Sequence, residues 1–205
     1  MNITDYLDNL PTHRDENYLY TDVKEALATV DTVVNASIDA TGIGGSIVGS
    51  VLQANEGETL SCVIAQDLIN LNAVAVSDIL HIEFNDQNPK PVEIFLSSDG
   101  GCNTLAQSRI DVVVTSESDG QLILRTNNLH SAANCVLNVS VEHDAKLDIV
   151  LIQTQKQEAP VFVSTIVNVS ENANVSVSTI NIDASLVRNN ILINLNGEHS
   201  NLRLY

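Results

Sequence analysis

The stretch "LNVSVEHDAKLDIVL" (residues 137–151) decides the fold, because apolar and polar residues alternate on both sides of a short acidic turn. In an extended strand, successive side chains point to opposite faces. Leu137, Val139 and Val141 therefore share one face, and polar residues occupy the other. The stretch predicts two strands, each with one buried face, joined by a tight turn.

Three further stretches repeat this order of strand, Glu-containing turn, polar–small pair and strand: "VVVTSESDGQLILRT" (112–126), "VNVSENANVSVST" (167–179) and "INLNGEHSNLRLY" (193–205). We align the copies on the small residue of the pair, which gives spacings of 25, 28 and 27 residues between Gly120, Ala145, Ala173 and Ser200. One acid tracks each turn: Glu117, Glu142, Glu171 and Glu198. A strand-only period of this size indicates a solenoid, since one repeat cannot bury its apolar face alone.

The repeat predicts a mainly β protein with a parallel β-helix, a single-stranded solenoid with about one turn per period. The leucine-rich frame is missing, and a propeller blade needs about 40 residues and four strands. An ordinary antiparallel sandwich with coincidental spacing is the alternative. A solenoid that stops inside a repeat also has an open edge, which needs a cap or a partner.

The first 90 residues differ in character and are expected to form an N-terminal α+β segment, with the β-helix core over residues 91–205 ending in mid-repeat. We predict a helical turn near residues 4–10, a helix capped by Asp22 and a helix over 65–76 with Leu68, Leu71 and Ala75 on one face. A strand is predicted over 79–84. The glycine-rich "ATGIGGSIVGS" (40–50) predicts a strand or hairpin with tight turns and lacks a phosphate-binding pattern.

Composition excludes several classes of partner. The chain has 205 residues, 44% of them hydrophobic, and a net charge of −17. Such an acidic chain is repelled by nucleic acid and by anionic membranes, so we expect to find neither among its partners. No signal peptide opens the sequence, and no apolar run reaches the length of a membrane span of about 18 residues.

The residues that carry chemistry in other proteins form no known pattern here. The three cysteines, Cys62, Cys102 and Cys135, are far apart and odd in number, which favours a reducing, cytoplasmic compartment. We place His143 and His199 at matching turn positions, and His13, His81 and His130 stand elsewhere without a metal-binding motif. No catalytic, cofactor-binding or metal residue is predicted, and the chain is not expected to be an enzyme.

One N-terminal stretch does resemble a known motif. "LPTHRDENYLYTD" (10–22) resembles the N-terminal motif of the SufB/SufD family, the scaffold proteins of SUF iron–sulfur cluster assembly. Leu19 departs from the motif, where a basic residue is usual. Residues 69–98 and 185–205 are also similar to family segments, in the same order. The motif is expected to have a structural or a docking role, and it matches at Leu10, Pro11, Thr12, Glu16, Asn17, Tyr18, Tyr20 and Thr21.

The resemblance implies a right-handed parallel β-helix preceded by a short helical or mixed segment, and it favours SufD over SufB. It implies SufB-like and SufC-like partners, and an iron–sulfur cluster in the whole assembly but none bound by this chain. The open end of the β-helix separately predicts a homodimer through that end. Family members are longer, so the chain is expected to be truncated before the C-terminal half. The alternatives are a carbohydrate-active or adhesive β-solenoid and a free-standing structural solenoid.

Overall fold

The computed structural model describes residues 7, 10–12, 14, 21–54, 60, 66–87, 89–98, 100–154, 159–182 and 186–205. The helical turn expected near residues 4–10 lies mostly outside these ranges. The elements are α2 (Val23–Ala26), β1 (Thr32–Asn35), β2 (Ser37–Thr41), β3 (Ile47–Gln53), α3 (Gln66–Ala75), β4 (Asp78–Phe84), β5 (Val92–Ser98), β6 (Thr104–Val114), β7 (Asp119–Leu129), β8 (Ala132–Val141), β9 (Lys146–Thr154), β10 (Val161–Val169), β11 (Asn174–Ile182), β12 (Val187–Leu195) and β13 (Asn201–Leu204).

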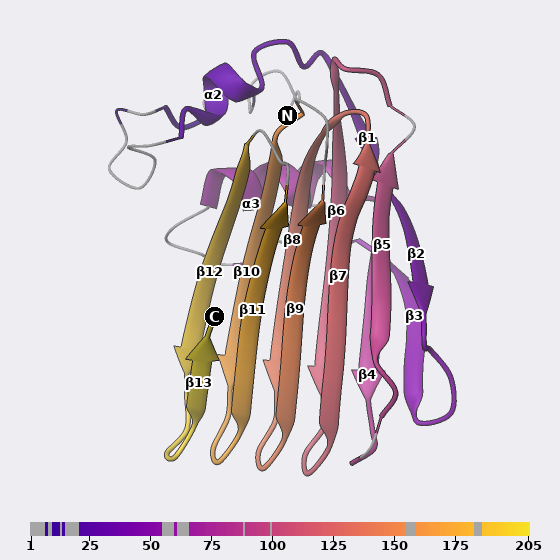
Figure 1. The fold of residues 1–205 in the computed structure, drawn as a ribbon, viewed down its shortest axis with the longest axis vertical. Helices are drawn as coiled ribbons and strands as arrows, with labels where there is room; N and C mark the ends of the chain where they lie inside the picture. The colour runs from indigo at the N-terminus through magenta and orange to yellow at the C-terminus, as the bar shows by residue number, and fades with distance from the viewer. Residues whose placement is uncertain are drawn as a thin grey trace.

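The strands form two facing sheets, and from β4 onward the chain crosses to the other sheet after each strand (Figure 1). One sheet has the order β12-β10-β8-β6-β4-β3, with β1 beside β6, and the other has the order β13-β11-β9-β7-β5-β2. Strands β6 to β13 pair only in parallel, each with its counterpart one turn away. The parallel β-solenoid of about four turns is therefore confirmed, and the antiparallel sandwich is wrong.

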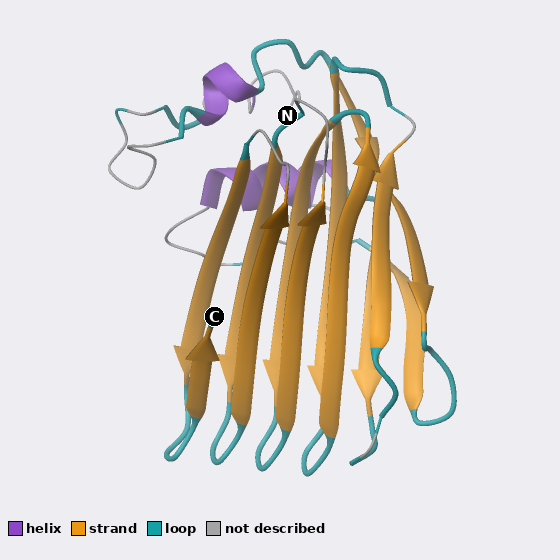
Figure 2. Cartoon of the chain, in the orientation of Figure 1, coloured by secondary structure: helices purple, strands orange, loops and turns teal. Residues whose placement is uncertain are grey.

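The tight turns that join the strands along one side of the solenoid form a ladder (Figure 2). Each contains one residue with positive φ: Glu117 at 60°, Asp144 at 58°, Asn172 at 56° and His199 at 58°, spaced 27, 28 and 27 residues apart. The backbone N–H of Glu117 donates to the carbonyl of His143 in the next turn at 3.1 Å, and Asp144 and Asn172 repeat this bond at 3.0 Å. Stacking therefore satisfies backbone groups that a single turn would leave unpaired.

The ladder corrects our alignment of the first repeat. Gly120 pairs with Leu147, whereas Asp119 pairs with Lys146. Ser118, which precedes Asp119, is therefore the counterpart of Ala145. Our alignment matched the small residues of the repeats. The register is set instead by the turn residue with a left-handed backbone, which is Glu117, directly before Ser118.

The same correction separates two further pairs that we had matched. Glu117 shares its turn position with Asp144, so it is not the counterpart of Glu142. His199 also occupies this left-handed position, whereas His143 comes one residue before it. The two histidines therefore do not occupy matching positions.

A left-handed residue other than glycine predicts a stabilising substitution. Glu117 is exposed and has a φ of 60°, so Glu117→Gly is expected to raise the free energy of unfolding by about 0.5–1 kcal/mol. Glu117→Gln is the control, because it removes the charge and keeps the Cβ. Urea denaturation followed by circular dichroism measures both, and an equal gain in the two variants would assign the effect to charge.

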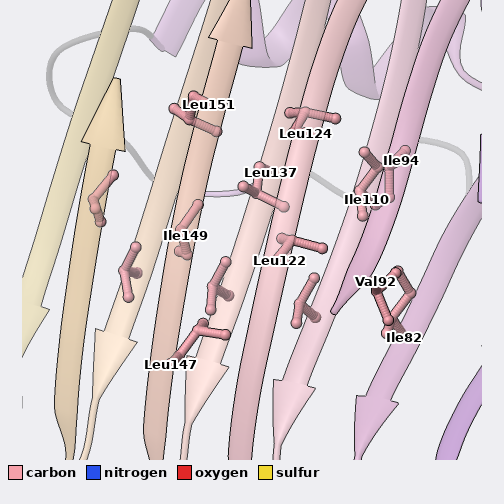
Figure 3. Packing of buried hydrophobic residues seen from close by; sticks show 14 of the residues in the cluster. Ile82, Val92, Ile94, Ile110, Leu122, Leu124, Leu137, Leu147, Ile149 and Leu151 are labelled. Carbon is pink, nitrogen blue, oxygen red and sulfur yellow. The ribbon is translucent and has the colours of Figure 1, made fainter. Parts of the chain in front are cut away.

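Apolar side chains from both sheets fill the space between them, as Figure 3 shows for the cluster around Leu137. Leu137 and Val139 are fully buried and Val141 is 1% exposed, while the alternate residues Asn138 and Ser140 are half-buried on the outer face. The predicted inward set of this strand is confirmed. Burial of each such side chain contributes about 1.5–3 kcal/mol.

Helix α3 covers the outer face of the sheet that contains β6, β8 and β10. It confirms the helix predicted over 65–76: Leu68 and Leu71 are buried, and Ala75 is half-buried. Ile69 packs against Val136 and Ile166 on the outer face of the strands. Because of this cover, the first halves of β6, β8 and β10 are buried on both faces.

A polar network joins α3 to the strands below it. The Asn72 side-chain amide donates to Gln107 Oε1 at 3.0 Å and to the Ser108 carbonyl at 2.9 Å. The Asn134 side-chain amide donates to the same Gln107 oxygen at 2.9 Å and to the Leu68 carbonyl at 2.8 Å. Since these residues are buried, the network fixes the position of the helix on the sheet.

The glycine-rich stretch 40–50 forms two strands and a tight turn, but not the hairpin that we considered. Strand β2 pairs antiparallel with β5, and β3 pairs antiparallel with β4 in the other sheet. Gly42 has a φ of 87°, which allows the chain to change sheets between them. Strands β1 to β4, from the first 90 residues, thus join the same two sheets as the later strands.

Candidate partner interface

The C-terminal end of the solenoid is open. Strands β12 and β13 are the outermost strands of their sheets, and within the described residues no strand pairs with their outer edges. Parallel pairing uses both edges of a strand, so the backbone groups on these outer edges can pair with a further strand.

The inward side chains of this last turn are incompletely covered. In the preceding turn, Val161 is 1% exposed and Val167 is fully buried. Their register partners Val187 and Ile193 are only partly buried against the same cluster. The large apolar side chains at this end are exposed by 43–71%: Ile180, Ile182, Leu195, Leu204 and Tyr205.

An end of this kind can accept an extended strand of a partner. The partner's backbone would continue a sheet, and its apolar side chains would cover the last turn. We inferred an open edge from the repeat alone but did not identify these side chains. The signal was present for two of them, because Leu195 and Leu204 belong to the apolar face of the fourth repeat.

The N-terminal family motif, as far as it is described, packs beside α3 over the starts of β6, β8 and β10. Leu10 is buried in a cluster with Val23, Leu27 and Leu68. The Pro11 carbonyl accepts a hydrogen bond from the Lys24 N–H at 3.2 Å. Thr12 and Thr21 are half-buried, and Thr12 Oγ1 accepts the Arg14 N–H at 3.2 Å. Glu16, Asn17, Tyr18 and Tyr20 lie outside the described residues, so the motif's role stays a prediction.

Asp22, directly after the motif, caps α2 as predicted. Its side chain accepts a hydrogen bond from the Glu25 N–H at 2.8 Å. Helix α2 (Val23–Ala26) ends two residues before the expected end at residue 28. The cap and the buried Val23 together fix where the chain enters the folded body.

The cysteines occupy different environments. Cys135 lies in the solenoid interior and is 1% exposed. Cys102 is exposed and lines a cavity of about 310 Å³ with His130, Thr29 and Pro160 among others. Both thiols are free, and Cys62 lies outside the described residues. Burial raises the pKa of the Cys135 thiol to about 11, since the interior disfavours the thiolate.

The raised pKa of Cys135 predicts a pH dependence of stability. Its value in the unfolded chain is near 9.0. The folded state disfavours the thiolate, so stability is fully present below pH 9 and falls as the pH rises toward 11. As the pH rises over this interval, the free energy of unfolding of Cys135→Ala is expected to fall by about 2 kcal/mol less than that of wild type. Denaturation at pH 8 and pH 10.5 measures this, and parallel curves for the two proteins would contradict it.

His143 contacts the neighbouring turn of the solenoid. His143 Nδ1 lies 2.8 Å from the Ser116 hydroxyl, and the Glu142 carboxylate accepts the Ser116 N–H at 2.9 Å. These contacts tie successive turns together. Within the described parts of the chain, no three or more His, Cys, Asp or Glu side chains are grouped so as to hold a metal ion.

None of the helices that the structure describes has the length and hydrophobicity to cross a bilayer.

The repeat region also has a recognisable family signature. Residues 95–205 match the family model described as "SUF system FeS cluster assembly, SufBD core domain". The match covers more than half of the chain, from β5 to the open end. The chain belongs to the SufBD core-domain family. No curated protein matches the chain.

Membership in the SufBD family places the chain in the SUF system of iron–sulfur cluster assembly, in agreement with the resemblance found in the sequence. The matched residues contain all four sequence repeats and the open C-terminal end. The N-terminal motif, α2 and α3 precede the match.

Proposed function

We propose that this SufBD-family chain is a SufD-like, non-catalytic component of a SufBCD scaffold in the cytoplasm, which acts by binding SufB-like and SufC-like proteins. The open last turn of the solenoid carries the proposal. It combines two free strand edges with exposed Leu195, Leu204 and Tyr205. The N-terminal motif favours the SufD-like assignment, and the free thiols of Cys102 and Cys135 fit a reducing compartment.

The proposed interface is strand addition at this end. A SufB-like partner would pair with β12 or β13 and cover the apolar side chains of the last turn. Without that partner, a second copy would bind the same end as a homodimer. An iron–sulfur cluster would then be the product of the whole assembly and would not be bound by residues of this chain.

Co-expression with SufB-like and SufC-like proteins of the same organism tests the proposal. The tagged chain is expected to capture both. Leu195→Glu together with Leu204→Glu should weaken capture at least about tenfold, because each change places a charge where apolar contact is required. Val74→Glu is the matched control, since Val74 on α3 is 39% exposed and distant in sequence from this end.

Two results would overturn the proposal. The first is no capture of either partner by the wild-type chain under reducing, low-salt conditions. The second is equal capture by wild type and by the Leu195→Glu/Leu204→Glu variant, which would remove the last turn as the interface.

A further inference from the structure

The last tight turn of the solenoid is longer than the three before it. Four residues connect the strands in each earlier turn: 115–118, 142–145 and 170–173. Five residues, 196–200, connect β12 to β13. The strands on both sides of this turn nevertheless stay in register with the preceding strands. The last turn therefore contains one inserted residue.

Gly197 is the inserted residue. The Asn196 N–H donates to the Val169 carbonyl at 2.8 Å, just as the Ser170 N–H donates to the turn before it at 3.0 Å. Asn196 thus keeps the position of Ser170, and the residue that follows has no counterpart. Gly197 lies against the backbone of Ser170 and Glu171, where a Cβ would collide with the Glu171 nitrogen. Only glycine fits at this position.

The insertion leaves a backbone N–H group without an acceptor. Within the described residues, the Gly197 N–H donates no hydrogen bond, and the exposed side chain of Asn196 makes none either. Asn172 in the preceding turn is also exposed, but the N–H of the residue after it, Ala173, donates to the Ser170 carbonyl at 3.3 Å. Asn196 therefore combines an exposed amide with a following residue that has an unbonded N–H and no side chain.

This combination favours spontaneous deamidation, and asparagine is among the thermolabile residues of proteins. The Gly197 nitrogen attacks Cγ of the Asn196 side chain, and the new C–N bond closes a succinimide ring. The bond from Cγ to the side-chain nitrogen breaks, and ammonia leaves with the proton from the Gly197 nitrogen. Water then opens the ring at one of its two carbonyls and yields aspartate or isoaspartate. No hydrogen bond of the attacking nitrogen has to break first.

We propose that Asn196 is a site of spontaneous deamidation, and that the modified turn binds a partner less well at the open end of the solenoid. Both products add a negative charge directly before Gly197 and Glu198, in a chain of net charge −17. Isoaspartate also lengthens the main chain between β12 and β13 by one carbon atom. Leu195, an exposed residue of the proposed interface, directly precedes the modified residue. The effect on binding rests on the proposed function, whereas the deamidation does not.

Ageing of the purified full chain tests the chemistry. The chain is held at physiological temperature under reducing conditions at pH 7 and at pH 9, and its peptides are compared with those of fresh protein by mass spectrometry. The peptide with Asn196 should gain the mass of an amide-to-acid conversion, and faster at pH 9, because attack requires loss of the Gly197 amide proton. The peptide with Asn172 is the matched control and should keep its amide over the same period.

A second readout identifies the product. Isoaspartate is a substrate for an isoaspartate methyltransferase, so methylation of the aged wild type is expected, and Asn196→Gln should abolish it. The longer glutamine side chain forms the corresponding ring much more slowly. An unmodified Asn196 at both pH values would overturn the proposal, and so would equal modification of Asn196 and Asn172.

Capture of the co-expressed SufB-like protein by fresh and by aged chain tests the effect on binding. In wild type, the aged chain should lose capture in proportion to its modified fraction, whereas aged and fresh Asn196→Gln should capture equally. An equal loss in the two proteins would overturn the effect on binding. No capture by the fresh wild-type chain would overturn the proposed function and the binding effect together. The mass measurement decides the deamidation separately, so the two failures are distinguishable.

Discussion

Truncation of Leu137 to alanine is expected to lower the free energy of unfolding by about 3–4 kcal/mol. Leu137 is fully buried in the middle turn of the solenoid. Its register partners are Ile110 in the turn before and Thr165 in the turn after. The stacked backbones hold these neighbours at a fixed spacing, so they cannot move in to fill the space that the missing methyl groups leave.

Urea denaturation followed by circular dichroism measures this loss, with the slope of the transition as a check that both proteins unfold to the same extent. Leu204→Ala is the control, because the same atoms are removed from a side chain that is 57% exposed. The control should lose less than about 1 kcal/mol. Equal losses in the two variants would show that the interior around Leu137 is loosely packed.

The solenoid could be predicted from sequence because its period and its alternation are both local signals. Each repeat has the strand period of two, and the inward set Leu137, Val139 and Val141 follows from it directly. The repeat also implied parallel stacking, since identical units bury a continuous core only when they are stacked in the same direction.

The exact register was not predictable from residue size. Gly120 is a small residue two positions into β7, where it faces Leu147 at a side-chain distance that a Cβ would crowd. Ser118 is the residue equivalent to Ala145. Because residue 116 is also a serine, residue type alone does not show which of the two serines is the equivalent one. Only the left-handed conformation of Glu117 marks the turn, and glutamate carries no preference for that conformation.

The ends of the solenoid were predictable only in outline. The repeat implied an open end, but exposure of Leu195 and Leu204 depends on which strands lie beside them. The stretch 40–50 was noted for its glycines. Its two strands join different sheets, and this depends on long-range pairing with β4 and β5. Sequence periodicity contains no information about such pairing, so β3 could not be assigned to an edge.

Asn72→Asp is expected to destabilise the protein by about 4 kcal/mol at pH 7, although the side chain keeps its shape. Asn72 is 1% exposed. Its amide nitrogen donates to two oxygens, Gln107 Oε1 and the Ser108 carbonyl. A carboxylate has no hydrogen to donate, so the substitution would place a negative charge against two acceptors in a buried site. Asn72→Ala should lose less, about 1–3 kcal/mol, because it removes the donor without adding a charge.

The pH dependence of stability distinguishes the penalty of the buried charge from the penalty of the lost hydrogen bonds. Burial beside two acceptors raises the pKa of the introduced carboxyl above its unfolded value of about 3.9. Its penalty is therefore smallest below pH 4 and grows as the pH rises through the interval between the unfolded and folded pKa values. Denaturation of wild type, Asn72→Asp and Asn72→Ala at pH 4.5 and pH 7 should show the aspartate variant approaching the alanine variant in acid. A constant difference between these two variants would mean that water or a shift of α3 solvates the carboxylate, and that the network does not hold α3 on the sheet.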